Sequence, residues 1–349
     1  MYYVGCDLHK KTITMHVVNQ TRQTVGSTRV SCSDTAGIVQ WLQRCRPFEI
    51  VVEATASYEW FVKLVEPLAQ RVVLAHPGKM RVIAESKRKS DNLDSKVLAE
   101  FLATDEIPQS YRPTPRQREH RRLVRHRYYL RKRTTSVKNR IRRILSDYNA
   151  DFPDLFAQRT RTQKRHVPAC LSGADRFVVE QLWREYDFCE EQREAVEQAI
   201  RKLAAEAPVA EAQARQLLHT IPGVGEVTVE AFLSEIGDVR RFGSQKKLTA
   251  YAGLSPGQRE SAGKVRELGI THCGSRLLRW ALNQASWQLV RRDLHWRPIF
   301  EGLAKRRGKK KAIVAISRRL LCVMMSMVTG GRPYRLAVAK RPPAKRLVC

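Results

Sequence analysis

The chain has 349 residues, 43% of them hydrophobic, which is enough to bury the cores of two or three domains. Its 64 lysines and arginines exceed its 34 aspartates and glutamates and give a formal net charge of +30. A generally basic surface is the plainer interpretation, but self-repulsion of this size favours a bound polyanion. The composition therefore excludes a disordered tail and predicts a folded protein that binds nucleic acid.

The eight cysteines contain no CxxC pair, and neither cysteines nor histidines fall at the spacing of zinc ligands. We interpret the cysteines as reduced thiols, which favours a cytosolic location. The N-terminal sequence MYYVGCDLHKK has no apolar signal core, and the apolar stretch after Arg318 and Arg319 is too short to span a bilayer. No membrane role is expected.

The first hundred residues predict an α/β domain. Three β-rich runs joined by short polar turns should form an antiparallel meander, and helices and strands then alternate. The strands are expected at 2–8, 12–19, 24–30, 49–54 and 71–76, and the helices at 34–45, 60–66 and 91–103. This order is typical of a ribonuclease H-like fold, in which strand ends and the last helix converge on one metal site.

Four acidic residues are expected at that place. Asp7 lies near the end of the first strand and Glu53 at the end of the fourth, where the carboxyl ends of parallel strands face a crevice. Asp91 and Asp94 are three residues apart and share one helix face, although Asp91-x-x-Asp94 also fits a helix cap. Because four clustered carboxylates repel one another, the pattern predicts divalent metal, Mg²⁺ or Mn²⁺, in one or two sites.

A basic helix follows the Pro-containing linker at 108–115. An apolar stripe in steps of four and three runs from Leu130 to Tyr148. The outer faces of the helix, from Arg116 to Arg143, are nearly all cationic and are opposed only by Glu119. Such a run is usually a solvated face, but here it favours a track for nucleic-acid phosphates. The candidates are Arg121, Arg122, Arg125, Arg131, Lys132, Arg133, Lys138 and Arg140.

A second, more acidic helix from Leu182 to Leu203 repeats this spacing and predicts a helical hairpin. Its narrow seam can be satisfied within one chain or by a second subunit.

Two glycine-containing segments follow. The segment LLHTIPGVGEVTVEAFL predicts a helix-hairpin-helix whose Gly223 and Gly225 let backbone N–H groups approach a phosphate, unless they only make a tight turn. The segment YAGLSPGQRESAGKVR predicts a loop in which Ser261 is a candidate nucleophile, and spacing alone does not separate it from Ser255. Neighbouring cations could stabilise the reacting phosphate: Arg259, Lys264 and Arg266.

Over nearly its whole length the chain resembles the DEDD transposases of insertion sequence 110, which include Piv-type DNA invertases. The resemblance rests on GCDLHK, VVEATASYEW and KSDNLDSKVLAEFLA, and then on IPGVG, EIGDVRRFGSQKKLTAYAGLSP and GSRLLRWAL, in which Arg276 is a further candidate for nucleic-acid contact. It implies a RuvC-like catalytic domain at 1–108, a coiled-coil arm at 109–208, and a mainly helical transposase domain with a basic tail at 209–349.

The resemblance also implies roles and partners. Asp7, Glu53, Asp91 and Asp94 would bind metal, and Ser261 would attack DNA to give a covalent phosphoserine. This sequence has Ser261-Ala262-Gly263 where the family commonly shows serine followed directly by glycine. The implied partners are donor and target DNA, a structured non-coding guide RNA made by the element, and further copies of the chain, as dimers that pair into a tetramer.

Two other interpretations remain open. A metal-dependent nuclease such as a junction resolvase would use the same four carboxylates with water as nucleophile, and would need no Ser261. A non-enzymatic nucleic-acid-binding scaffold would need only the basic helix, and would leave the four acids without a role.

Overall fold

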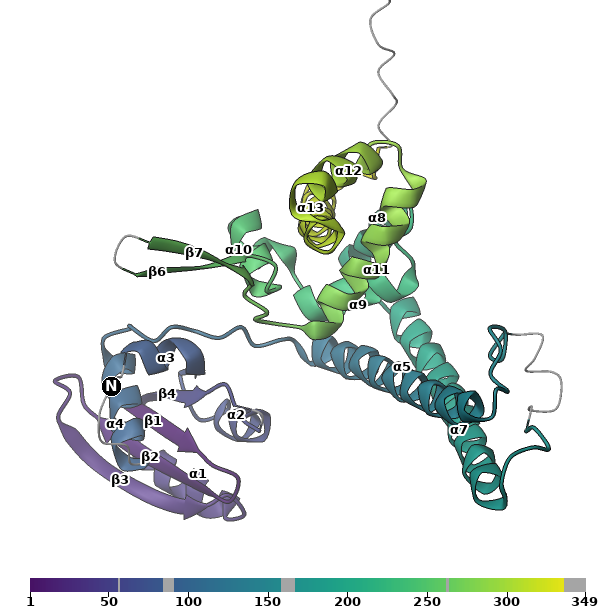
Figure 1. Ribbon diagram of the computed structural model, residues 1–349. Coiled ribbons are helices and arrows are strands. Elements are labelled where there is room, and N and C mark those ends of the chain that lie inside the picture. The colour runs from purple at the N-terminus through teal and green to yellow at the C-terminus, as the bar shows by residue number, and fades with distance from the viewer. Residues whose placement is uncertain (56, 84–90, 158–166, 262–263, 336–349) are drawn as a thin grey trace, which may run out of the picture. The chain divides into compact units, whose positions relative to one another are not determined.

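The computed structural model describes residues 1–55, 57–83, 91–157, 167–261 and 264–335 (Figure 1). For 81–83, 91–93, 258–261 and 264–267 it describes the backbone alone. The chain divides into two compact units, Met1–Pro113 and Thr114–Cys349. The second unit holds both the predicted helical arm and the C-terminal part, and the predicted boundary near residue 208 stays a prediction.

The first unit is built on a five-stranded sheet in the order β3-β2-β1-β4-β5. Strands β1 (Tyr2–Leu8), β2 (Thr12–Val18) and β3 (Thr24–Ser31) form the predicted antiparallel meander. Strands β4 (Phe48–Glu53) and β5 (Arg71–Ala75) extend the sheet in parallel with β1. The predicted order of elements up to this point is confirmed.

Helices cover both faces of this sheet. On one face, α1 (Thr35–Gln43) and α2 (Glu59–Val65) bury Ile38 and Phe61 against the side chains of Cys6 and Val52. On the other face, α3 (Pro77–Ile83) and α4 (Asp91–Ala103) pack on Val51, Val73 and Ala75. Alternate residues of each strand serve the two faces, because side chains along a strand point to opposite sides. Helix α3 was not predicted.

The predicted linker is bound to the edge of the first unit. Gln109 forms a bridge with Ala75, and the Ser110 amide donates to the carbonyl of Leu74 over 2.7 Å. Arg112 then donates to Glu59 and Glu66 of the α2 region. These contacts explain why the compact unit continues to Pro113.

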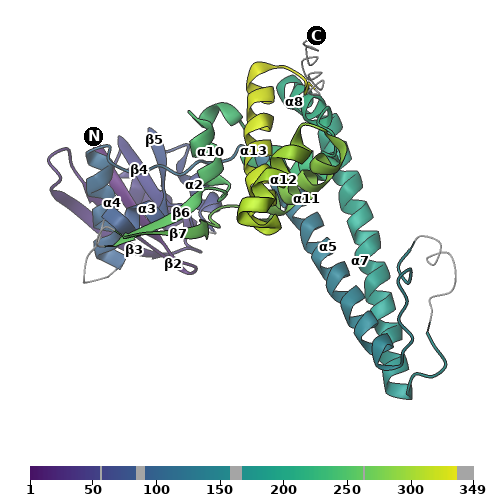
Figure 2. The same cartoon turned by 45° about the horizontal axis from the view of Figure 1, so that its top comes forward.

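The second unit begins with two helices of 33 residues each, α5 (Pro115–Asp147) and α7 (Gly173–Ala205). The Thr114 and Ser172 hydroxyls cap them by accepting bonds from the Gln117 and Asp175 amides. The helices lie side by side in Figures 1 and 2 and bury Ile141 between them. Within this chain, the seam of α5 is thus packed against α7, as the predicted hairpin required.

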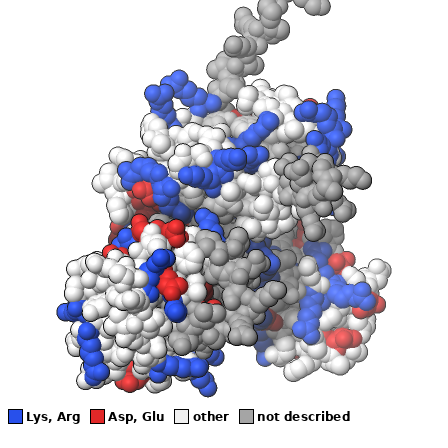
Figure 3. Space-filling model, turned by 90° about the vertical axis from the view of Figure 1, so that its left-hand side faces the viewer, with Lys and Arg blue, Asp and Glu red and all other residues white. Residues whose placement is uncertain are grey.

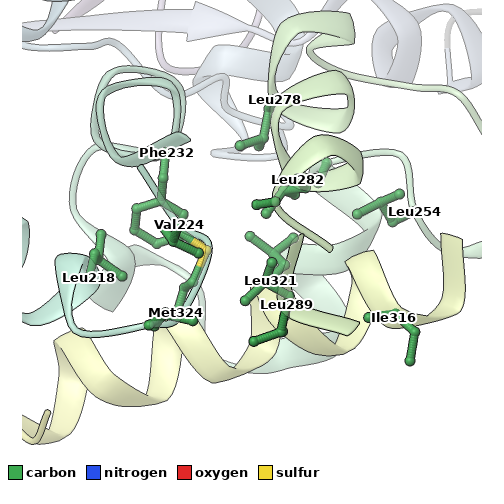
Figure 4. Close-up of a cluster of buried hydrophobic side chains, with 14 of the residues drawn as sticks. Leu218, Val224, Phe232, Leu254, Leu278, Leu282, Leu289, Ile316, Leu321 and Met324 are labelled. Atoms are coloured by element: carbon green, nitrogen blue, oxygen red, sulfur yellow. The ribbon is translucent and has the colours of Figure 1, made fainter. Parts of the chain in front are cut away.

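The remaining helices of the second unit enclose a large apolar core. They are α8 (Val209–His219), α9 (Glu226–Ile236), the 3-10 turn η1 (Val239–Arg241), α10 (Gln245–Tyr251), α11 (Arg276–Arg292), α12 (Trp296–Arg307) and α13 (Lys309–Gly330). Figure 4 shows Leu218, Phe232, Leu282, Leu289 and Met324 converging from four of these helices.

One expectation about this part was wrong. The segment predicted as a loop at 251–266 contains two strands, β6 (Pro256–Ser261) and β7 (Lys264–Ile270), which pair as an antiparallel ribbon. The apolar stretch after Arg318 and Arg319 belongs to α13, and this helix of 22 residues has, by length and composition only, what a membrane span needs. In the structure this helix buries Ile316, Leu320 and Met324 in the protein core instead.

Candidate active site

Two of the predicted carboxylates lie at adjacent positions of the first unit's sheet. Strands β1 and β4 are parallel, with Cys6 paired to Val52. Asp7 and Glu53 are the next residues of the two strands. Because paired positions of neighbouring strands present side chains to the same face, Asp7 and Glu53 share a face at the carboxyl ends of these strands.

Gly5 shows which face that is. A Cβ atom on Gly5 would lie 2.0 Å from the Ser95 carbonyl oxygen and 2.5 Å from the Ala99 nitrogen, both in α4. Gly5 therefore faces α4 at close range, and Asp7, two residues further along the strand, faces the same side. The motif GCD thus combines a glycine that admits the helix backbone with an aspartate beside it.

The direction of α4 follows from contacts at its other end. Arg71, the first residue of β5, makes ion pairs with Glu49 near the start of β4 and with Asp105 just beyond α4. The C-terminal end of α4 therefore lies at the starts of the parallel strands, and its first turn lies at their carboxyl ends. Asp91 and Asp94 belong to that first turn.

Asp94 is one helical turn before Leu98, which is buried against the sheet, so the two share a face of α4. Asp94 is exposed, and the side chain of Asp91 lies outside the described residues. Asp7 is 18% exposed, with one carboxylate oxygen 3.0 Å from Nε2 of His9. Burial, and then the Asp7 charge, raise the pKa of the Cys6 thiol well above its ordinary value.

The donor set suits a hard divalent cation, because its predicted members are all carboxylates. Among the side chains that the structure describes, no three His, Cys, Asp or Glu lie close enough to hold a metal. The described carboxylates Asp7 and Glu53 fit such an ion in chemistry and share one face of the sheet, but the four-residue metal site stays a prediction.

The two candidate serines occupy different places: Ser261 is in the β6–β7 ribbon, and Ser255 precedes it. Ser261 is the last residue of β6 and pairs with Lys264, while Arg259 pairs with Arg266. The side chains of these four residues lie outside the described part of the chain. Ser255 lies before the ribbon, where its carbonyl accepts a bond from the Thr271 amide and its hydroxyl lies 3.4 Å from that of Thr249.

Several cations of the predicted phosphate track have internal partners. Arg125 donates two bonds to the Glu235 carboxylate, at 2.8 and 2.9 Å, and Arg121 donates to the carbonyls of Ser234 and Glu235. Arg121, whose side chain is only 15% exposed, therefore offers little surface to a phosphate in this arrangement. Both residues connect α5 to α9.

Other cations of α5 lie over aromatic rings or remain exposed. The Arg131 guanidinium lies 4.2 Å from the Trp280 ring centre, and Lys138 lies over Phe156 and Tyr186. Arg133 pairs with Glu185 on α7. The exposed candidates are Arg122, Arg125, Lys132, Arg133 and Arg140, of which Arg125 is paired with Glu235. On the face drawn in Figure 3, Lys and Arg side chains are spread widely, with fewer Asp and Glu among them.

Two buried carboxylates of α9 were not singled out from the sequence. Glu230, which is 4% exposed, accepts from Arg215 over 2.7 Å and lies 2.7 Å from His120 Nε2. Burial favours the protonated carboxyl, but the hydrogen bonds from His120 and Arg215 outweigh it and lower the Glu230 pKa to about 2. Glu235, 2% exposed, holds Arg125 in the same way. The sequence carried a signal for these pairs, because the segment EVTVEAFLSEI is mostly apolar and a carboxylate buried in such a helix must be paired.

The two glycines of the IPGVG turn differ. Gly223 has a φ of +82°, and a Cβ there would lie 2.6 Å from the Gln288 side chain, so this glycine permits close packing on α11. Gly225 precedes α9 as its cap and has no atom within 4 Å of a Cβ position. The helix hairpin is therefore present, and only Gly225 has open space beside it.

Comparisons with known proteins place this arrangement in a functional class. A family model described as Transposase, for the DEDD transposases of IS110, matches residues 4–150, and a model described as Transposase IS116/IS110/IS902 family matches residues 215–301. The matches cover the sheet that carries Asp7 and Glu53 and the core that carries the ribbon. They identify the protein as a DNA transposase or recombinase.

The relatives agree with this class. The chain is 25% identical to the transposase for insertion sequence element IS1328 of Yersinia enterocolitica, over 81% of this chain and 82% of the relative. It is 24% identical to the transposase for insertion sequence element IS1111A of Coxiella burnetii, over 95% of this chain and 91% of that relative. A pilin gene-inverting protein of Moraxella bovis is 35% identical over 34% of this chain and 38% of its own length. The chain belongs to the DEDD transposases of the IS110 family.

Proposed function

We propose that this transposase cuts and rejoins DNA strands with Ser261 as nucleophile and the carboxylates of a RuvC-like first unit as the metal-binding group. The observation that carries the proposal is the meeting of Asp7, Glu53 and the first turn of α4 at one edge of the sheet. The strand order β3-β2-β1-β4-β5, with helices on both faces, supports a ribonuclease H-like fold for this unit.

The proposed chemistry is a pair of phosphoryl transfers. The Ser261 oxygen attacks a DNA phosphorus and loses its proton, a phosphoserine ester forms, and the displaced DNA oxygen leaves as a hydroxyl. A hydroxyl of the exchanged strand then attacks the phosphoserine and releases the serine. A divalent cation held by the carboxylates would stabilise negative charge on the reacting phosphate. The phosphoester retains the bond energy, so rejoining requires no nucleotide cofactor.

The proposed partners follow the family resemblance and the charge of the chain. The net charge of +30 supports binding of double-stranded donor and target DNA and of a structured non-coding guide RNA. The exposed cations of α5 and the open Gly225 turn are the described places where phosphates could bind. We propose that dimers pair into a tetramer, in which the carboxylates of one subunit serve the serine of another.

The test is a protein–DNA adduct that survives denaturation. Purified protein is incubated with donor DNA, guide RNA and Mg²⁺, and the adduct is digested and mapped by mass spectrometry. We expect Ser261→Ala to abolish both adduct and recombination while nucleic-acid binding persists, and Ser255→Ala to retain both.

The nuclease alternative predicts a different result. Cleavage without any adduct, equal in Ser261→Ala and unmodified protein, would identify water as the nucleophile and reject the serine mechanism. An adduct mapped to Ser255 would reject the choice of Ser261.

A further inference from the structure

The two chain segments that enter and leave the β6–β7 ribbon cross at very close range. A Cβ on Gly253 would lie 1.9 Å from the Cys273 carbonyl oxygen, and a Cβ on Gly274 would lie 2.1 Å from the Tyr251 carbonyl oxygen. The Thr271 amide also donates to the Ser255 carbonyl over 3.0 Å. Backbone therefore packs directly on backbone at this crossing, which we call the ribbon root (residues 251–255 and 271–274).

Arg279 of α11 binds both halves of the ribbon root with a single nitrogen. Its Nη1 lies 3.1 Å from the Ala252 carbonyl oxygen on the entering segment. On the leaving segment it lies 2.6 Å from the Cys273 carbonyl oxygen and 3.2 Å from that of Gly274. Burial, and then the Arg276 charge, lower the Arg279 pKa, but a guanidinium stays protonated in proteins.

The Ala252 carbonyl in the ribbon root attracts the Arg279 charge for a second reason. Ala252 is the C-cap of α10, so its carbonyl belongs to the negative end of that helix. Arg279 therefore makes a charge-assisted bond to the Ala252 carbonyl, which would otherwise lack a helical partner. Lysine at this position would bring one point charge without a planar guanidinium.

The ribbon depends on its root for direction. Figure 1 shows β6 and β7 as a two-stranded ribbon extending from the helices of the second unit, and a lone pair of strands has little stability of its own. From Ser255 to Ser261 the strand spans roughly 20 Å at about 3.3 Å per residue, so a tilt of about 10° moves Ser261 by roughly 3 Å. A misplacement of about 1 Å can cost a reaction on the order of a hundredfold.

We propose that Arg279 is a positioning residue that fixes the direction of the β6–β7 ribbon and thereby the place of Ser261. The role of Ser261 rests on the proposed function, whereas the effect of Arg279 on the ribbon does not. The two can therefore be tested separately.

The first experiment measures the ribbon itself in the full chain. Spin labels carried by unnatural amino acids at position 268 on β7 and position 209 on α8 report one distance distribution; Leu268 and Val209 are exposed. We expect Arg279→Gln to broaden or shift this distribution and Arg279→Lys to restore it in part. The matched control is Arg176→Gln, which removes a bond from an arginine to the Ala169 carbonyl in the helical arm and should change nothing.

The second experiment measures DNA cleavage at saturating nucleic acid. We expect Arg279→Gln to reduce the cleavage rate at least about tenfold with unchanged DNA affinity. The cleavage rate of Arg279→Lys should lie between those of Arg279→Gln and unmodified protein. If Arg279→Gln does not fold by circular dichroism, the lysine variant provides both readouts. An unchanged distance distribution in a folded Arg279 variant overturns the inference. A disturbed ribbon with normal cleavage and no adduct at Ser261 would leave the ribbon effect intact and reject the proposed nucleophile.

Discussion

Substitution of Gly5 by alanine tests how closely the sheet and α4 must pack to assemble the carboxylates. The added methyl would lie 2.0 Å from the Ser95 carbonyl oxygen, 2.5 Å from the Ala99 nitrogen and 3.0 Å from the Leu98 Cβ. Ordinary contact is near 3.4 Å. The two nearest atoms belong to the backbone of α4, so the helix must move away from β1 by about 1 Å or more.

Overpacking of this kind costs about 1–3 kcal/mol, and alanine regains about 0.5–1 kcal/mol in a strand because glycine loses more entropy on folding. A net loss of about 1–2 kcal/mol would lower the melting temperature of a unit of this size by roughly 5–15 °C. The shift of α4 also separates Asp94 from Asp7. We therefore expect Gly5→Ala to lose DNA cleavage while nucleic-acid binding persists.

Calorimetry of the full chain, together with hydrogen exchange of the α4 amides, measures the effect. Gly26→Ala in β3 is the matched control, because a Cβ there has no atom within 4 Å and stability should change by less than about 0.5 kcal/mol. Equal melting and equal α4 protection in the two variants would refute the packing argument.

The other predictions concern charges. Glu230 has a pKa of about 2 in the folded chain against 4.5 ordinarily, so its stabilisation, about 3 kcal/mol, is complete above pH 4.5 and is lost as the pH falls toward 2. Lowering the pH from about 6 to about 3 should therefore lower the melting temperature of unmodified protein more than that of Glu230→Gln. Equal dependence of the two melting temperatures on pH would contradict this. Replacing each predicted metal-binding acid by its amide should abolish cleavage but not nucleic-acid binding, with Glu49→Gln, at the other end of β4, as a control that stays active. Full cleavage by Asp94→Asn would instead support the helix-cap interpretation. Arg140→Glu should lower the salt dependence of binding by about 0.7–0.9 in log–log slope at normal stability. Arg125→Glu should destabilise the protein, because it faces buried Glu235, and a normal melt would contradict this.

The first unit could be predicted in detail because its signals are local. β-Rich runs joined by short polar turns predicted strands β1, β2 and β3. The predicted helix at 91–103 has the same bounds as α4. Placing Asp7 beside Glu53 required only that β1 and β4 be parallel neighbours in register. The direction of α4 agrees with the expected convergence of its first turn on the strand ends, as the ion pair of Arg71 with Asp105 at its other end indicates.

The ribbon was missed because glycine and serine dominated the interpretation of its sequence. One sequence signal pointed to strands: only two residues, Ala262 and Gly263, separate Ser261 from Lys264, with which it pairs. The chain within 262–263 lies outside the described residues. A two-residue connection that contains glycine is typical of a β-hairpin, but the polar segment PGQRES before it lacks the alternation that would have made the prediction firm.

The charge of α5 shows why a local count of cations does not define a nucleic-acid surface. Along the helix almost nothing opposes the arginines, yet Arg127 pairs with Glu197 and Arg125 with Glu235, partners 70 and 110 residues away. These pairs neutralise a buried carboxylate, Glu235, and a partly exposed one, Glu197, so the paired charges contribute little net attraction for a polyanion. Phosphate binding by this helix must therefore depend on its exposed cations, among them Arg122, Lys132 and Arg140, and its strength should follow salt concentration accordingly.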